Sequence, residues 1–333
     1  MAENGKQAHN FPSNNHISNN FYPNRNIGVL FSFISLFFLG ILPIISKSRP
    51  SALDALSFAF YLSLWELICT IPLFIYELTK NNKGIFQKSI DSKVRKKTLG
   101  IMVITGVIFT FSTFFYVYAF ETAGTVSAAI AIQTYPLFSI LMEFILYRKR
   151  KRLVELIFTL TMIVGIYYLG TEGTWVITGF SPWFALALIV PFLWSIAHVS
   201  IKNTIDTSPI TPNQVTFFRV FISSILLFGI SSSFRGTNKI LEGLLNPEFQ
   251  IFGFLMGFVY YLELVNWFYA VKHVDVSLAS TVTTPNPVIT MVLALLILKE
   301  PIELYQIIAM IIVFASLYGL LWSGKVKNHK KSA

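Results

Sequence analysis

Long apolar stretches separated by short polar gaps run through almost the whole chain after residue 26. Each stretch is close to the ~20 residues with which a helix crosses ~30 Å of hydrocarbon. The ten stretches lie at about 27–45, 56–78, 98–120, 125–146, 153–170, 183–201, 214–232, 251–271, 276–298 and 304–322. The run from Leu137 to Leu146 lacks the strict alternation of barrel strands, and a backbone in hydrocarbon must satisfy its own hydrogen bonds. The pattern therefore predicts an all-α membrane protein with ten transmembrane helices.

The two halves of the chain are weakly similar at an offset of 151 residues, which aligns 118–120 with 269–271 and Pro136 with Pro287. Because five is an odd number, two five-span halves enter the membrane from opposite sides. The sequence thus predicts a 5+5 inverted repeat, with halves at 27–170 and 183–322, as is typical of secondary transporters. A polar, Asn-rich and disordered N-terminal tail is expected at 1–26, and a basic C-terminal tail at 323–333.

Composition and charge support a membrane protein and give it an orientation. Of the 333 residues, 54% are hydrophobic and only 13% are charged, which excludes an ordinary soluble enzyme. With the N-terminus in the cytoplasm, 20 of the 26 Lys and Arg residues lie on the inner side and 5 on the outer side. We therefore expect a multi-pass protein, of the plasma membrane, with both termini cytoplasmic. This distribution accounts for the net charge of +10 without nucleic-acid binding.

The two aligned prolines mark a candidate binding site. Pro136 and Pro287 lie inside the fourth and ninth spans, where a proline removes a backbone hydrogen bond. Polar residues flank both, among them Gln133, Thr284 and Asn286. Interrupted helices in matching positions of two halves are a sequence indication of a transporter's binding site. We expect the prolines to act as hinges beside a substrate; simple packing kinks are the alternative.

Glu263 is the clearest ionisable candidate, because it lies midway along the eighth span. A charge at the bilayer centre is costly, so such residues are usually functional. Tyr260, Asn266 and Trp267 lie three or four residues away and are expected on the same helical face. Glu263 could bind a cationic group of a substrate or a proton, which would allow proton coupling. The alternative is a structural acid bonded to a neighbouring helix.

Four further residues inside spans are weaker candidates. Glu66 in the second span and Arg219 in the seventh belong to helices that the repeat makes partners, so they could pair or line opposite gates. For Arg219 we favour a side chain that extends to the headgroups instead. His198 could relay protons, although a packed histidine is more common. Tyr116 is a modest candidate for the cavity wall.

The segment YAVKHVDVSLASTVTTPNPVITMVLALLILKEP, Tyr269 to Pro301, resembles the EamA-like branch of the drug/metabolite transporter superfamily. The segment IELYQIIAMIIVFASLYGLL that follows, a fainter copy at Tyr118 to Leu146, and FFRVFISSILLF from Phe217 extend the resemblance over roughly 27–322. The resemblance implies ten helices in a 5+5 inverted repeat around a central cavity. It also implies transport of amino acids, metabolites, drugs or nucleotide-linked sugars.

These observations predict a secondary active transporter of a small polar or amphipathic metabolite, such as an amino acid or a related compound. It would work by alternating access and could be coupled to protons. A non-transporting membrane scaffold or receptor is the alternative. No Walker loop, dinucleotide-binding glycine pattern or His/Cys metal spacing occurs, so we expect no enzyme activity and no cofactor or metal. The expected partners are a small-molecule substrate and the lipid bilayer, with protons and a second copy of the chain in a homodimer as options.

Overall fold

The computed structural model describes residues 24–79, 83–147, 153–176 and 182–329, and within these ranges the chain forms helices and no strand. Most of the predicted N-terminal tail and the basic run at 148–152 lie outside the described residues. Six helices are long and apolar enough to cross a membrane: α1 (Arg25–Ser48), α2 (Ala55–Thr79), α3 (Ser92–Ala123), α7 (Pro182–Thr207), α8 (Pro212–Arg235) and α10 (Pro247–His273).

The remaining helices are shorter or only partly apolar. Shorter apolar segments lie in α6 (Leu153–Gly170) and α13 (Leu304–His329), and α13 continues past the predicted end of the last span at 322. A 3₁₀ turn (Gly84–Phe86) lies in the connection between α2 and α3. The short helix α9 (Thr237–Leu244) lies between α8 and α10.

The predicted fourth and ninth spans are each interrupted, and at equivalent places. The fourth is divided into α4 (Thr125–Ile132) and α5 (Tyr135–Tyr147). The ninth is divided into α11 (Val276–Thr283) and α12 (Asn286–Leu293), which continues as a π-helical turn over Ala294–Leu298. The starts and ends of α4 and α11, and the starts of α5 and α12, all correspond at the offset of 151 residues. The predicted interruptions are thus present in both halves.

The aligned prolines explain where the helices end. A proline has no N–H for the carbonyl four residues earlier, and its ring clashes with that carbonyl. For Pro136 that carbonyl belongs to Ile132, and for Pro287 to Thr283, which are the last residues of α4 and α11. Each proline is the second residue of the next helix, where no intrahelical N–H bond is needed. The breaks therefore lie at the middle of the molecule, and neither proline costs a hydrogen bond inside α5 or α12.

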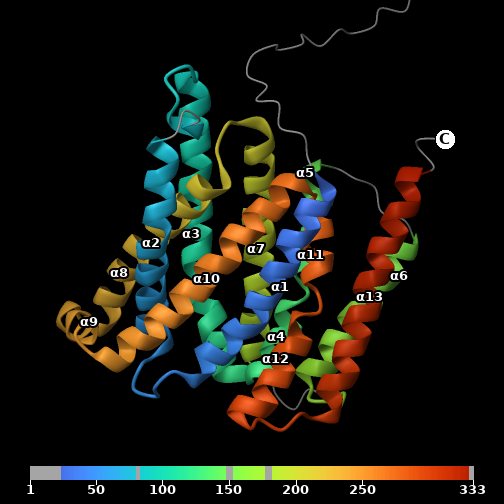
Figure 1. The fold of residues 1–333 in the computed structure, drawn as a ribbon. Coiled ribbons are helices and arrows are strands. Elements are labelled where there is room, and N and C mark those ends of the chain that lie inside the picture. The colour runs from blue at the N-terminus through green and yellow to red at the C-terminus, as the bar shows by residue number, and fades with distance from the viewer. Residues whose placement is uncertain (1–23, 80–82, 148–152, 177–181, 330–333) are drawn as a thin grey trace, which may run out of the picture.

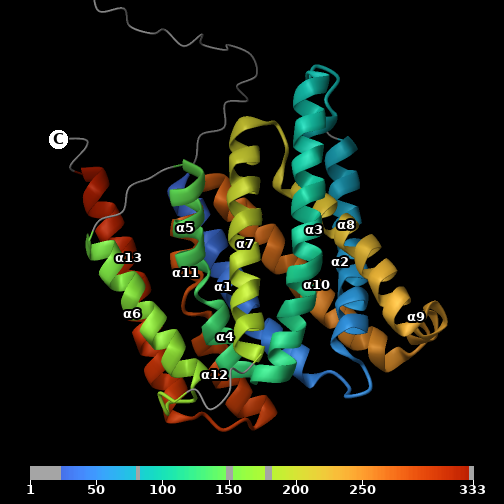
Figure 2. The same cartoon turned by 180° about the vertical axis from the view of Figure 1, so that it is seen from behind.

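The first helix of each half packs against the third helix of the other half. In this arrangement α1 packs on α10, and α7 packs on α3. Figures 1 and 2 show α1, α7 and the broken helices in the middle, with α2, α8 and α9 on one side and α6 beside α13 on the other. This exchange of equivalent helices fits an inverted repeat, because a two-fold axis in the membrane plane relates the two contacts.

Close packing of α2 against α10 depends on a glycine. A Cβ at Gly257 would lie 2.5 Å from the carbonyl oxygen of Leu62 and 2.8 Å from the backbone nitrogen of Glu66. Small residues at helix interfaces in membranes allow backbones to approach in this way. Gly257 therefore brings Glu66 of α2 against the middle of α10, close to the residues considered below.

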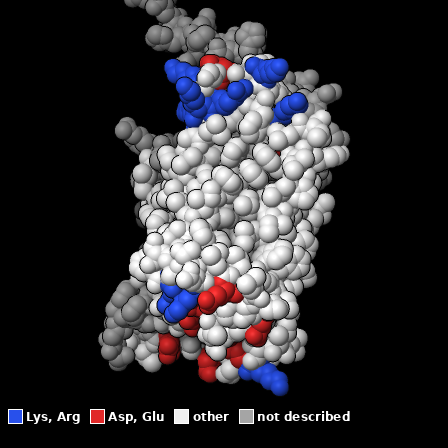
Figure 3. All heavy atoms as spheres, turned by 90° about the vertical axis from the view of Figure 1, so that its left-hand side faces the viewer, with Lys and Arg blue, Asp and Glu red and all other residues white. Residues whose placement is uncertain are grey.

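Charged side chains occupy the two ends of the molecule and avoid its middle. Figure 3 shows Lys and Arg gathered at the end where α2 ends and α3 begins, and mostly Asp and Glu at the opposite end. The band between them is uncharged on this face. Apolar side chains in the middle part of α3, such as Ile104 and Phe111, are exposed. A soluble monomer rarely exposes so large an apolar surface. The band is the surface expected to face hydrocarbon.

Candidate functional site

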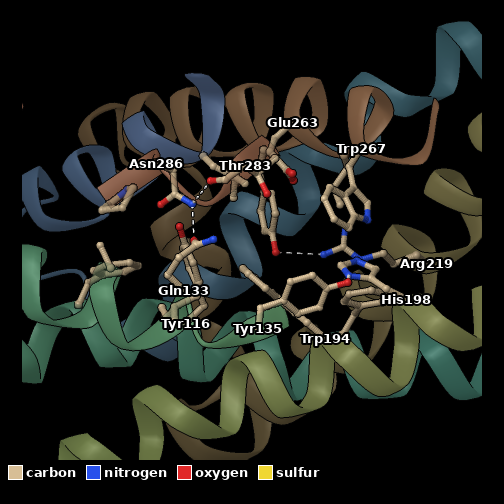
Figure 4. Close-up of a pocket in the computed structure, with 18 residues that line it drawn as sticks. Tyr116, Gln133, Tyr135, Trp194, His198, Arg219, Glu263, Trp267, Thr283 and Asn286 are labelled. Atoms are coloured by element: carbon tan, nitrogen blue, oxygen red, sulfur yellow. Dashed lines mark hydrogen bonds between the residues drawn. The ribbon is translucent and has the colours of Figure 1, made fainter. Parts of the chain in front are cut away.

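A cavity lies at the centre of the bundle, where the two broken spans face each other. Its walls come from α1, α3, α4, α5, α7, α8, α10, α11 and α12, so both halves contribute. Most of the lining is aromatic or apolar, with a few polar and charged groups (Figure 4). The lining residues are Leu39, Pro43, Phe109, Tyr116, Phe120, Ala129, Ile132, Gln133, Tyr135, Trp194, His198, Arg219, Tyr260, Glu263, Leu264, Trp267, Thr283 and Asn286.

Seven of the ten residues predicted to bind substrate or couple transport line this cavity. They are Tyr116, Gln133, His198, Tyr260, Glu263, Trp267 and Asn286. The chain positions of these seven residues span more than 160 residues of sequence, and the fold brings them into one cavity. Their role in binding or coupling stays a prediction.

Asn266, Thr284 and Glu66 do not line the cavity. The stripe on α10 that does so runs through Tyr260, Glu263, Leu264 and Trp267. At 100° per residue Asn266 lies to one side of this stripe, and its amide donates to the carbonyl of Leu262 in the same helix at 2.6 Å.

Thr284 and Pro287, one of the two hinge candidates, are not among the lining residues. The buried hydroxyl of Thr284 donates to the carbonyl of Ser280 at 2.9 Å, which helps to cap the end of α11. Pro287 is buried. Pro136 is the second residue of α5, and its side chain lies outside the described part of the structure. Both prolines therefore lie at the two breaks, and their role as hinges stays a prediction.

A hydrogen bond joins the two helix breaks across the cavity. The side-chain nitrogen of Asn286 donates to the side-chain oxygen of Gln133 at 2.6 Å and to the carbonyl of Thr283 at 3.0 Å. Gln133 belongs to the first half and Asn286 to the second. The contact links the two interruptions directly. Any relative movement of the halves must therefore either break this hydrogen bond or move both residues together.

Arg219 is buried among aromatic rings and one acid. Only 2% of it is exposed; its Nη1 lies 3.4 Å from Glu66 Oε1 and its Nη2 donates to the hydroxyl of Tyr260 at 3.1 Å. Its Cζ lies 3.9 Å from the centre of the Phe109 ring, a cation–π contact. The interpretation of Arg219 as a side chain that reaches the headgroups is therefore wrong. Glu66 supplies the counter-charge, as the repeat-based pairing predicts.

Glu263 is the second buried acid, 5% exposed, and it faces the cavity. The hydroxyl of Ser35 on α1 donates to its Oε1 at 2.8 Å. Within the described part of the chain Glu263 forms no ion pair, because Arg219 is paired with Glu66. The two acids thus have different surroundings: Glu66 has a counter-charge and Glu263 has a neutral donor.

Tyr135 and Trp194 line the cavity and were not among the predicted site residues. Arg219 lines it too, although a position at the headgroups was favoured for it. Tyr135 lies directly before Pro136, and its hydroxyl is 3.1 Å from Nδ1 of His198. Trp194 lies one turn before His198 on α7, so the four-residue spacing was a usable signal. Among the described residues no group of three His, Cys, Asp or Glu side chains is placed to hold a metal ion.

Comparison with known proteins gives a consistent result. The model of the EamA-like transporter family matches residues 26–171 and 181–322. A protein of Methanothermobacter thermautotrophicus described as an uncharacterized transporter is 22% identical over 327 residues, covering 91% of this chain and 89% of its own. A solved crystal structure with 15% identity aligns with a TM-score of 0.59 over 89% of this chain and 98% of the other, a likeness of fold.

Proposed function

Because the chain belongs to the EamA-like transporter family, within the drug/metabolite transporter superfamily, we propose that it is a secondary active transporter that works by alternating access. Its substrate is a small polar or amphipathic metabolite, such as an amino acid or a related compound. The observation that carries the proposal is the cavity between two matching helix breaks, walled by both halves. Such a site becomes accessible from either side when two near-equivalent halves exchange conformations.

Proton coupling is assigned to Glu263. It is a buried carboxyl on the cavity wall, and the neutral hydroxyl of Ser35 donates a hydrogen bond to it. In the ionised form Glu263 adds a second negative charge to the site, where Arg219, the one Lys or Arg among the described lining residues, already has Glu66 as partner. Taking up a proton removes that charge, so the proton and the substrate can influence each other through the shared cavity.

Transport itself is tested by flux in proteoliposomes that hold the purified chain. Vesicles preloaded with an unlabelled amino acid or metabolite should take up the labelled compound transiently, by counterflow, for at least one member of a panel. An inward proton gradient should increase the uptake. A scaffold or receptor would give the same trace as protein-free vesicles for every compound, and that result would contradict the proposal.

Ten membrane crossings, with both termini in the cytoplasm and the plasma membrane as location, are also part of the proposal. The support is that the basic end of the molecule is the end at which α1 begins and α13 ends, and that the opposite end is mostly acidic. Both broken spans would cross as pairs of half-helices, because α4 with α5 and α11 with α12 each run between the two ends (Figures 1 and 2).

Cysteine accessibility checks this orientation, since the chain has one cysteine, Cys69. In a Cys69→Ser background, a membrane-impermeant maleimide should label Ser51→Cys and Thr174→Cys on intact cells. Lys93→Cys and Asn203→Cys should react only after permeabilisation. All four positions are exposed and lie in connections or at helix ends. If the second pair were labelled on intact cells and the first pair were protected, the protein would have the opposite orientation in the membrane.

A further inference from the structure

Four buried nitrogens on the cavity wall have no hydrogen-bond partner within the described part of the chain. They are Nε of Arg219, Nε1 of Trp194, Nε1 of Trp267 and Nε2 of His198. Each of these side chains is more than nine-tenths buried, and all four line the cavity. Buried polar groups are normally bonded, so four unpartnered nitrogens on one wall need an explanation.

The four side chains gather at one end of the cavity. Figure 4 shows Arg219, His198, Trp194 and Trp267 together, with Gln133 and Asn286 at the other end. The ring centre of His198 lies 5.2 Å from that of Trp267 and 6.4 Å from that of Trp194. The unpartnered nitrogens therefore belong to one cluster, here named the donor cluster.

The donor cluster offers N–H groups and almost no acceptor. Arginine and tryptophan nitrogens can only donate. The Tyr135 hydroxyl lies beside Nδ1 of His198, and when that hydroxyl donates, the ring proton is on Nε2, which becomes a fourth donor. The two nearby carboxylates do not satisfy these atoms, because Glu66 faces Nη1 of Arg219 and Glu263 accepts from Ser35.

A ligand with several acceptor oxygens is the chemical complement of this cluster. A carboxylate or phosphate presents more lone pairs than the four nitrogens can use, and hydrogen bonds to a charged oxygen are about twice as strong as neutral ones. Next to the cluster the wall is aromatic: the Tyr116 ring lies 5.5 Å from that of Trp194, and the Tyr135 ring 5.9 Å from that of Trp267. This aromatic wall suits an apolar or flat body that packs against it.

We propose, building on the transport function above, that the substrate is an organic anion whose carboxylate or phosphate group binds to Arg219, Trp194, Trp267 and His198. Its aromatic or apolar body lies along Tyr116 and Tyr135 toward the helix breaks. The anion completes the hydrogen bonding of the donor cluster, whereas a neutral or cationic head group of the same size leaves the donors unpaired or repels Arg219.

Binding is tested on the purified full chain with four probes of similar shape. These are 3-phenylpropanoate, phenyl phosphate, 3-phenylpropanamide and 2-phenylethylamine. A thiol-reactive dye that reports exposure of Cys69 on unfolding gives the melting temperature without relying on tryptophan fluorescence. One or both anions should raise the melting temperature in proportion to concentration, because a ligand of the folded state stabilises it. The amide and the amine should not. The response of each anion separates a carboxylate from a phosphate substrate.

Tryptophan variants test the donors without removing the rings. Trp267→Phe and Trp194→Phe each delete one N–H, and each should raise the dissociation constant of the bound anion about tenfold or more. Trp175→Phe is the matched control, because Trp175 is exposed and lies outside the cavity; it should leave the constant unchanged. Equal binding of the amide, anion binding unaffected in both cavity variants, or no response to either anion would each overturn the proposal.

The flux assay keeps this proposal distinct from transport itself. Anion binding that depends on the tryptophans, together with no counterflow of the bound anion, would support the donor cluster and contradict the transporter. Counterflow of a neutral or cationic compound, with no anion bound, would support the transporter and contradict the donor cluster.

Discussion

Glu263→Gln is expected to abolish proton-driven accumulation while counterflow of the substrate continues. Glutamine has the shape of a protonated glutamate and can still accept from Ser35, whose hydroxyl lies 2.8 Å from Glu263 Oε1. It cannot release or bind a proton, so the cycle runs without coupling. In proteoliposomes, uptake in the variant should be the same with and without an inward proton gradient. The wild type should accumulate substrate at least about tenfold, as each tenfold ratio corresponds to about 1.4 kcal/mol of driving force.

The same substitution elsewhere on α10 provides the control. Glu248 is exposed in the first turn of that helix, far from the cavity, so Glu248→Gln should retain gradient-dependent uptake. Ser35→Ala removes the hydroxyl that bonds Glu263 and leaves the carboxyl in place. Uptake by this variant should therefore still depend on pH, with the midpoint of the pH profile shifted. If the Glu263→Gln variant accumulated substrate like the wild type, Glu263 would not be the coupling group; another group would couple transport to protons, or transport would not be coupled to them.

Much of the fold followed from local features of the sequence. The length of the apolar runs predicted the long helices, and the prolines predicted the interruptions because a proline acts on the carbonyl four residues before it. Pro136 and Pro287 therefore marked both breaks within a few residues. The repeat offset of 151 also holds for the start of each half-helix. The extra turns of α13 to His329 were not predicted, because their sequence is as polar as a tail.

The site was harder to predict, because a residue's neighbours on other helices decide which face turns inward. The face of α10 shows the limit: Tyr260, Glu263 and Trp267 line the cavity, and Asn266 lies outside the stripe. For Arg219 two interpretations were open, a buried ion pair or a side chain at the headgroups, and the wrong one was favoured. Only the packing of α8 against α2 shows that Glu66 lies within reach of the guanidinium. The partnership of Ser35 with Glu263 is equally long-range, at 228 residues of separation.

Substituting one partner of the Glu66–Arg219 pair should destabilise the protein far more than substituting both. Each side chain is 2% exposed, and an ion left without its partner in such a place costs about 3–5 kcal/mol. Arg219→Met and Glu66→Gln should therefore each lower the stability by several kcal/mol, with Arg219→Met the larger because it also removes the contacts with Phe109 and Tyr260. In Glu66→Gln with Arg219→Met no charge remains, and much of the loss should return.

A double-mutant cycle in the unfolding free energy measures this coupling, which should exceed about 1 kcal/mol. The exposed pair Lys202–Asp206, one turn apart on α7, is the comparison and should show about 0.5 kcal/mol or less. Purely additive losses at Glu66 and Arg219 would mean that the two groups do not stabilise each other. The double variant also separates structure from binding: it should regain stability and still fail to bind the anions, because Arg219 belongs to the donor cluster. Recovery of both stability and anion binding would limit Arg219 to a structural role.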